Sequence, residues 1–291
     1  MNLRTLVNLR TLVAASAALL LAPAAWAGFV TFEAAGANPA AITPMVNNFR
    51  TAVGGGAVGG DNGSFGGLRR EINWDGVPET RSDPNSFPSN FFNVNSPRGV
   101  VFVTPGTGFL VSANSTSATP TLFGFSSDFQ TFSTQKLFTA VNSNITDVRF
   151  FLPGTSIAAT TSAFGAIFVD VEVAALTSIQ FFDENDLLIF ARDALVAGNQ
   201  GLSFVGAVAN AGERISRVRL TSGNNTIVSN GVPGNPSGDS VVMDDFLYAE
   251  PVQFRAVPEP SSLALFALGL FGCMAGYRNR RQRVGSKRQV I

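Results

Sequence analysis

Short apolar segments, separated by glycine, proline, asparagine and aspartate, constrain the fold of this chain most strongly. They recur from about residue 69 onward, and the intervening sequence gives no clear amphipathic helix of about ten residues or more. Within 163–190, three apolar stretches follow one another, and the polar residues Asp183 to Asp186 separate the last two. A polar connection of that length suits a hairpin. The pattern predicts an all-β fold, a β-sandwich or jelly roll of about nine to eleven strands.

The segment 28–68 differs from the rest of the central region. Gly28 to Phe32 is a short apolar stretch that predicts a first strand, and Ala34 to Leu68, which contains GGGAVGGDNGSFGG, predicts a flexible or looped segment. We therefore expect the regular β-sandwich domain to span 69–255. Pro-Gly pairs at Pro105-Gly106 and Pro153-Gly154 predict turns within it.

An apolar run near the N-terminus predicts export. Arg4 and Arg10 precede this run, and Ala25 and Ala27 supply the small residues that signal peptidase reads. We therefore expect residues 1–27 to form a signal peptide.

A second apolar run, 261–277, lies near the C-terminus and carries no charged residue. Its length is at the lower end of the roughly 17–25 residues that a membrane-spanning helix needs. The basic segment 278–291 follows and is expected to stay cytoplasmic under the positive-inside tendency. A transmembrane helix is the resulting prediction.

Immediately before that run lie four residues, Val257, Pro258, Glu259 and Pro260. A Pro-Glu-Pro triplet, a short apolar helix and an arginine cluster, in this order across 257–283, resemble the PEP-CTERM sorting signal of exported bacterial proteins. The same segment is also labelled an ice-binding protein C-terminal domain. The central region is similar to uncharacterised β-sandwich modules that occur with this signal, and this resemblance brings no activity with it.

The PEP-CTERM resemblance implies a route to the cell surface. Signal peptidase and an exosortase-type membrane protease would process an inner-membrane-anchored precursor near the Pro-Glu-Pro triplet. The product would reside in the cell envelope, on the cell surface or in the extracellular matrix of a bacterium that makes extracellular polysaccharide. Polysaccharide is therefore an expected partner.

The charge of the exported part differs from that of the whole chain. The chain has 20 basic and 20 acidic residues, but two basic residues lie in the predicted signal peptide and six follow Tyr277, which leaves 12. Among the acidic residues only Glu259 lies outside 28–257, which leaves 19, so the net charge of that part is about −7. Nucleic acid is excluded as an expected partner, since it requires a basic surface.

Histidine is absent and Cys273, in the C-terminal apolar run, is the only cysteine. The exported part therefore cannot form an internal disulfide, and it lacks Ser-His-Asp catalysis, Cys-His catalysis and the usual zinc ligands. We expect no catalytic site.

Asp244 and Asp245 lie inside the apolar strand VVMDDFLY. Because successive side chains of a strand point to opposite faces, one carboxylate should face inward unless a bulge intervenes, and it then needs a partner. Two kinds of partner remain open. With Glu33 from the first strand, the aspartates would offer the oxygen ligands of a structural calcium ion. Alternatively, an arginine such as Arg98 or Arg214 would form a buried ion pair.

Three other segments also predict local structure, and the first two of them have an alternative. Arg217 and Arg219 share one face of a predicted strand, which we expect to be solvated, with cross-strand pairing as the alternative. Trp74 beside Asp75 resembles a sugar site but equally fits a core anchor followed by a turn. Ile167 to Val173 alternate, which predicts one core face.

Three classes of function fit these features. The first is a non-catalytic module, exported and sorted by exosortase, that binds exopolysaccharide or builds the matrix. The second is a glycan-active enzyme, which needs paired carboxylates about 5–9.5 Å apart. The third is an ice-binding protein, which would repeat threonine along one flat face, and the sequence shows no such ladder.

Overall fold

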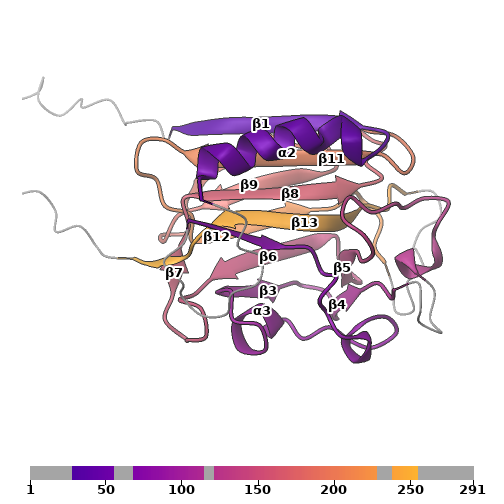
Figure 1. Cartoon of the computed structure of the whole chain (residues 1–291), viewed down its shortest axis with the longest axis horizontal. Helices are drawn as coiled ribbons and strands as arrows, with labels where there is room; N and C mark the ends of the chain where they lie inside the picture. Colours follow the sequence, from indigo (N-terminus) through magenta and orange to yellow (C-terminus); the bar gives the residue numbers. More distant parts are fainter. Residues whose placement is uncertain (1–27, 56–67, 115–120, 228–237, 255–291) are drawn as a thin grey trace, which may run out of the picture. The chain divides into compact units, whose positions relative to one another are not determined.

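The computed structural model describes residues 28–55, 68–114, 121–227 and 238–254 (Figure 1). The strands are β1 (Phe29–Gly36), β2 (Arg69–Ile72), β3 (Val100–Val103), β4 (Gly108–Val111), β5 (Phe138–Val141), β6 (Ile145–Phe150), β7 (Ala159–Thr160), β8 (Ala163–Val169), β9 (Ser178–Phe182), β10 (Leu188–Asp193), β11 (Leu202–Ala209), β12 (Arg217–Thr221), β13 (Val242–Ala249) and β14 (Val252–Gln253). The helices are α2 (Pro39–Val53) and α3 (Phe91–Val94), with 3-10 turns η1 (Glu79–Arg81) and η2 (Leu122–Gly124).

The described part of the chain is mostly β, as the sequence predicts, and its strands pair in antiparallel fashion. It contains fourteen strands rather than nine to eleven. Two of the additional strands, β7 and β14, have only two residues each and pair with one another. Such short strands leave no recognisable pattern in a sequence.

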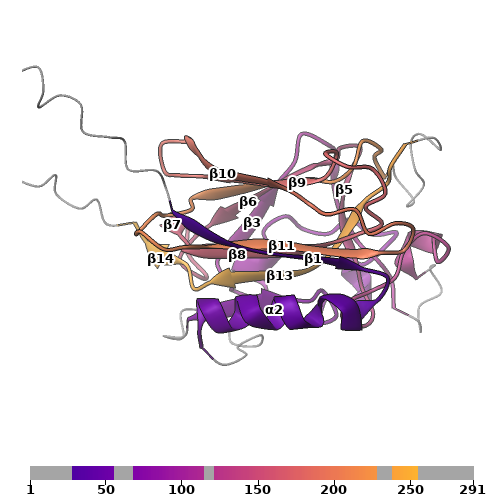
Figure 2. The same cartoon turned by 90° about the horizontal axis from the view of Figure 1, so that it is seen from above.

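Two sheets form separate layers (Figure 2). The larger has the order β1-β11-β8-β13-β5-β4, with β2 also paired to β13, and the smaller has the order β10-β9-β12-β6-β3. The main apolar core contains side chains of both sheets. Phe164 of β8, for example, contacts Phe150 and Phe181 of the smaller sheet, with ring centroids 6.2 and 6.5 Å away.

Helix α2 corrects the prediction that the segment after the first strand is a loop. The side chain of Asn38 caps the helix by accepting from the Ala41 N–H at 3.2 Å, and a proline occupies the first turn, where its missing donor costs nothing. Ile42, Val46 and Phe49 follow at helical spacing and are fully buried. This is one apolar stripe, and each side chain contributes about 1.5–3 kcal/mol by its burial.

Helix α2 lies over β1 and β11 on the outer face of the larger sheet (Figure 2). The strand β8 is buried on both faces, and the prediction of a single core face is wrong. Ile167 and Val169 belong to the core cluster that also contains the buried side chains of α2 and residues of the 121–132 segment, whereas Phe164 and Phe168 point between the sheets. The strand β1 also joins this sheet, through β11, so the β domain begins before residue 69.

A pair of glycines lets the α2 layer approach the sheet closely. Gly165 of β8 and Gly206 of β11 lie directly opposite each other. A Cβ atom at Gly206 would stand 3.0 Å from Phe49 of α2 and 3.1 Å from Phe204. The phenyl rings of Phe49 and Phe204 occupy this space in an edge-to-face contact at 5.5 Å.

Two of the predicted connections have different outcomes. The hairpin at Asp183 to Asp186 is confirmed, because it joins the paired strands β9 and β10. Pro105-Gly106 does lie between two strands, but β3 belongs to the smaller sheet and β4 to the larger one. The connection therefore crosses between the layers.

Candidate functional site

Asp244 and Asp245 lie in a β-bulge in the middle of β13. Met243 pairs with Phe168 of β8 and Phe246 pairs with Ala166, so the two aspartates stand opposite the single residue Ile167. A bulge of this kind breaks the alternation of side chains. The exception that the sequence left open is therefore the one that occurs, and the two carboxylates do not point to opposite faces, since both reach the hydroxyl of Ser133.

The two carboxyl groups are buried, with 0% and 4% of Asp244 and Asp245 exposed. The Phe132 N–H donates to Asp244 Oδ2 at 2.6 Å, and Ser133 Oγ lies 2.7 Å from Asp245 Oδ1 and 3.2 Å from Asp244 Oδ1. These contacts come from the loop before β5, and they supply the partners that burial requires.

Burial and mutual repulsion change the acidity of this carboxyl pair. Desolvation, together with the neighbouring charge of Asp245, holds the pKa of Asp244 well above its usual range. Desolvation also raises the pKa of Asp245, although a hydrogen bond from Asp244 opposes that rise. This direction of shift favours a protonated Asp244 that donates a hydrogen bond to Asp245.

Glu33 lies far from this pair, and the structure does not group the three carboxylates. Both oxygens of Glu33 accept from Arg192 of β10, at 2.6 and 2.7 Å. Two strands, β11 and β8, separate β1 from β13, which places the strands about 14 Å apart. A single ion cannot join carboxylates at that spacing, so the predicted set of Glu33, Asp244 and Asp245 is wrong as a set.

The alternative arginine partners also lie elsewhere. Arg98 donates to the Glu71 carbonyl at 3.3 Å and stands 5.3 Å from the centre of the Phe92 ring. Arg214 is exposed. A network at the end of α2 instead acts on Asp245, where the charge of Glu71 raises its pKa and that of Arg50 lowers it.

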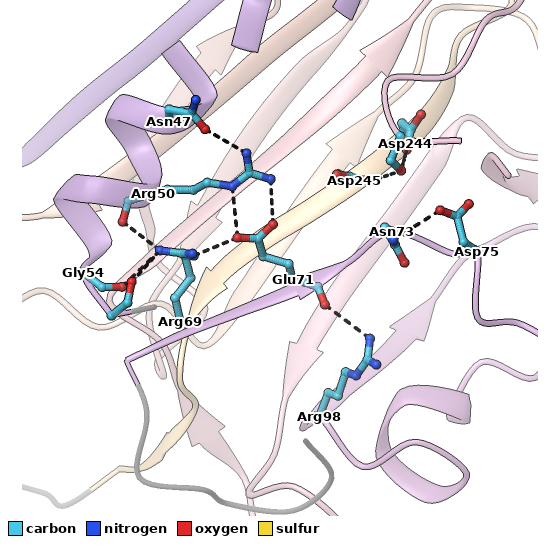
Figure 3. A network of polar contacts seen from close by, with 12 residues as sticks. Asn47, Arg50, Gly54, Arg69, Glu71, Asn73, Asp75, Arg98, Asp244 and Asp245 are labelled. Atoms are coloured by element: carbon cyan, nitrogen blue, oxygen red, sulfur yellow. Dashed lines mark hydrogen bonds and ion pairs between the residues drawn. The ribbon is translucent and has the colours of Figure 1, made fainter. Parts of the chain in front are cut away.

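Glu71 is the centre of that network (Figure 3). Its carboxylate accepts from Arg50 at 2.7 and 3.0 Å and from Arg69 at 2.8 Å. Burial raises the pKa of Glu71, but the hydrogen bonds and charges of the two arginines outweigh it and leave the pKa lowered. Arg69 also donates to carbonyls at the C-terminus of α2, including Gly54 and Gly55. The network fastens α2 to β2.

A second acidic cluster consists of Asp170, Glu172 and Asp239. One carboxylate oxygen from each lies within 4.8 Å of the others, so the cluster could hold a metal ion. Asp170 and Asp239 are buried and Glu172 is exposed. Burial raises the pKa of Asp170 to about 7, with further contributions from Glu172, Asp128 and Asp239, and burial also raises the pKa of Asp239.

Backbone N–H groups donate hydrogen bonds to two of these carboxylates. Asp170 accepts from the Gln200 N–H at 2.8 Å, and Asp239 accepts from the Val173 N–H at 3.1 Å. Three carboxylates supply hard oxygen ligands, which suit calcium rather than a soft metal. The cluster thus links the segments that follow β8 and precede β13.

This cluster leaves no clear signal in the sequence, because Asp239 lies about 70 residues from Asp170 and Glu172. Asp170 and Glu172 follow β8, and Asp239 precedes β13. These strands are antiparallel neighbours that pair Val169 with Val242, so the end of one lies beside the start of the other. The pairing of β8 with β13 was the missing information, and Asp-x-Glu at the end of a strand was the only local sign.

Trp74 is a core anchor. Its side chain is 1% exposed, stacks on Phe138 at 4.1 Å and donates from Nε1 to the Asp244 carbonyl at 2.7 Å. The following residues form the predicted turn, in which the Val77 N–H donates to the Trp74 carbonyl. A sugar cannot reach this indole.

Arg217 and Arg219 of β12 form ion pairs across strands, which was the alternative to a solvated face. Asp147 of β6 accepts from Arg219 at 2.8 and 2.9 Å and from Arg217 at 3.3 Å. Arg217 also pairs with Asp186, and its guanidinium lies 3.7 Å from the centre of the Phe182 ring. The expectation of a solvated face therefore fails for Arg217, which is buried.

Ser82 and Lys136 form a contact that resembles a catalytic dyad in composition only. Lys136 Nζ donates to Ser82 Oγ at 2.8 Å and to the Val77 carbonyl at 2.6 Å, and it also pairs with Glu79. Ser82 is fully buried and Lys136 is 2% exposed. No substrate can reach this hydroxyl, so the contact is structural.

The remaining predicted sites fall outside the described residues. These are the signal peptide with Ala25 and Ala27, the motif Val257 to Pro260 and the apolar run 261–277. Among the residues that the structure does describe, no helix is long and apolar enough to cross a membrane.

Taken with its ordered, mostly β central region, the C-terminal segment places this chain among exported proteins that carry a sorting signal. The family model that matches is the PEP-CTERM protein-sorting motif, over residues 256–281. The chain is therefore an exosortase-sorted protein of the cell envelope. The match covers the signal and not the β domain. Comparison with curated proteins and with solved structures gives no match.

Proposed function

We propose that the β domain is a non-catalytic module that binds or organises exopolysaccharide at the cell surface. The main support is the sorting motif at 256–281, which follows directly on the β domain. The chemistry of the domain agrees with this role. Burial raises the pKa of both Asp244 and Asp245, and they lie inside the protein rather than along an open cleft.

A second part of this proposal concerns stability. Asp170, Glu172 and Asp239 would hold a structural calcium ion that ties the end of β8 to the start of β13. The support is the close spacing of three carboxylates together with the raised pKa of Asp170. A domain without internal disulfides gains from such a link, because a ligand that binds only the folded state stabilises it.

The binding role is tested by affinity electrophoresis of the full chain in gels that contain exopolysaccharide from a bacterium that sorts PEP-CTERM proteins. We expect the chain to migrate more slowly than in a plain gel and to leave the polysaccharide uncleaved. Albumin serves as the mobility control. Equal mobility in both gels would refute the binding role, whereas turnover that is lost on an Asp or Glu substitution would establish the glycan-active alternative.

A further inference from the structure

A pocket of about 240 Å³ lies on the smaller sheet, where the end of β6 meets the β9–β10 turn. It is separate from the aspartate pair and from the acidic cluster. The lining residues that matter here are Arg149, Phe151, Asp183, Glu184, Asp186 and Arg217.

The two arginines of the pocket differ in their partners. Arg149 of β6 and Arg217 of β12 lie directly opposite each other. Arg217 is already paired with Asp147 and Asp186. Arg149 is exposed, and nothing in the described ranges hydrogen-bonds or ion-pairs with its guanidinium. One cation with free donors therefore faces the pocket.

The acidic residues Asp183 and Glu184 line the other side of the pocket and offer free acceptors. Asp183 uses Oδ1 to accept from the N–H groups of Asn185 and Leu187, at 2.8 and 2.9 Å, and this shapes the turn. Glu184 is exposed, and within the described part of the chain no group pairs with its carboxylate. The pocket thus combines unpaired donors on one side with unpaired acceptors on the other.

This combination selects against a charged ligand. An anion would be attracted by Arg149 but repelled by Asp183 and Glu184, and a cation would be attracted by these carboxylates but repelled by Arg149, so a ligand of either charge meets a like charge in the pocket. A hydroxyl group avoids both penalties, because it accepts from a guanidinium and donates to a carboxylate. The half-buried ring of Phe151 adds an apolar surface for the C–H face of a sugar.

The size of the pocket limits what fits. Sites for drug-sized ligands usually measure about 300–1,000 Å³, so this smaller pocket suits a single ring. We propose that it binds one ring of an uncharged, hydroxyl-rich saccharide, with Arg149 donating to one hydroxyl and Glu184 accepting from another. This names the ligand class of the binding role proposed above and rests on it.

Saturation-transfer NMR on the full chain in detergent tests the site. The probes are glucose, galactose and mannose, with glucuronate and glucosamine as charged analogues. At least one neutral hexose should bind, and more tightly than either charged analogue. Arg149→Gln and Glu184→Gln should each weaken its binding about tenfold, the effect of one charge-assisted hydrogen bond. Arg81→Gln, at an exposed arginine of η1 outside the pocket, should leave it unchanged.

A charge-specific effect separates recognition from a structural role. Glu184→Gln removes a repulsive carboxylate, so glucuronate should gain relative to the neutral hexose. The site would be overturned if binding of the neutral hexose survived both pocket substitutions, or if a charged analogue bound best. Retention in polysaccharide gels would in that case still support the broader binding function. Absence of both hexose binding and gel retention would refute the two proposals together.

Discussion

Replacement of Asp244 by alanine is expected to lower the free energy of unfolding by about 3 kcal/mol. The change leaves the half-buried N–H of Phe132 without its acceptor and removes the hydrogen bond between Asp244 and the buried Asp245. Each unsatisfied buried group costs about 1–3 kcal/mol. Denaturation by urea, followed by circular dichroism, measures this loss.

Asp244→Asn is the matched control. Its amide reproduces the protonated carboxyl group, with one oxygen for the Phe132 N–H and an N–H for Asp245, so stability near pH 5 should stay close to that of the parent. An alanine variant as stable as the asparagine variant would contradict the network described for this bulge.

The same pair predicts a dependence on pH. The folded pKa of Asp244 is raised above its ordinary value of 3.8, so its stabilising effect is complete below about pH 4 and declines as the pH rises through the folded pKa. Asp244→Asn no longer titrates and should lose less stability between pH 5 and pH 9 than the parent does. Parallel curves for the two proteins would show that Asp244 is not protonated in the folded state.

Calcium is expected to raise the melting temperature of the chain at pH 8, above the pKa of about 7 that burial gives Asp170. At a calcium concentration one hundred times the dissociation constant, the stabilisation is about 2.7 kcal/mol, and EDTA should reverse it. The ion would bring together three carboxylates that otherwise repel one another.

Two substitutions locate that effect. Asp239→Asn should abolish the calcium-dependent shift, because it removes a buried ligand. Asp193→Asn removes an equal charge from an exposed position on β10 and should preserve the shift. If both variants keep the calcium-dependent shift, or if the parent protein shows no shift, the calcium site is ruled out.

Much of the β architecture was predictable because it depends on local pattern. The turn at Asp183 to Asp186 is polar and short, which is sufficient to predict the β9–β10 hairpin. The helix α2 was missed because its apolar stripe, Ile42, Val46 and Phe49, is diluted by small residues and interrupted by Pro44. Without that helix, burial of the second face of β8 had no visible cause.

The acidic sites required information that local patterns do not hold. Burial of carboxylates at Asp244 and Asp245 follows from the apolar residues around them, but the bulge that turns both toward Ser133 depends on the pairing with β8. Asp239 joins Asp170 for the same reason. In each case the sheet register, and not the residue types, brings the groups together.

Mass spectrometry of both termini, on protein recovered from the surface of an exosortase-containing bacterium, tests the central claim of envelope sorting most directly. We predict a mature chain that begins near Gly28 and ends near the Pro258-Glu259-Pro260 triplet, without the arginine-rich tail. A triple alanine substitution of the triplet should keep the tail and leave the chain in the inner-membrane fraction. Surface protein that still ends at Ile291, or equal processing of the substituted chain, would contradict the account.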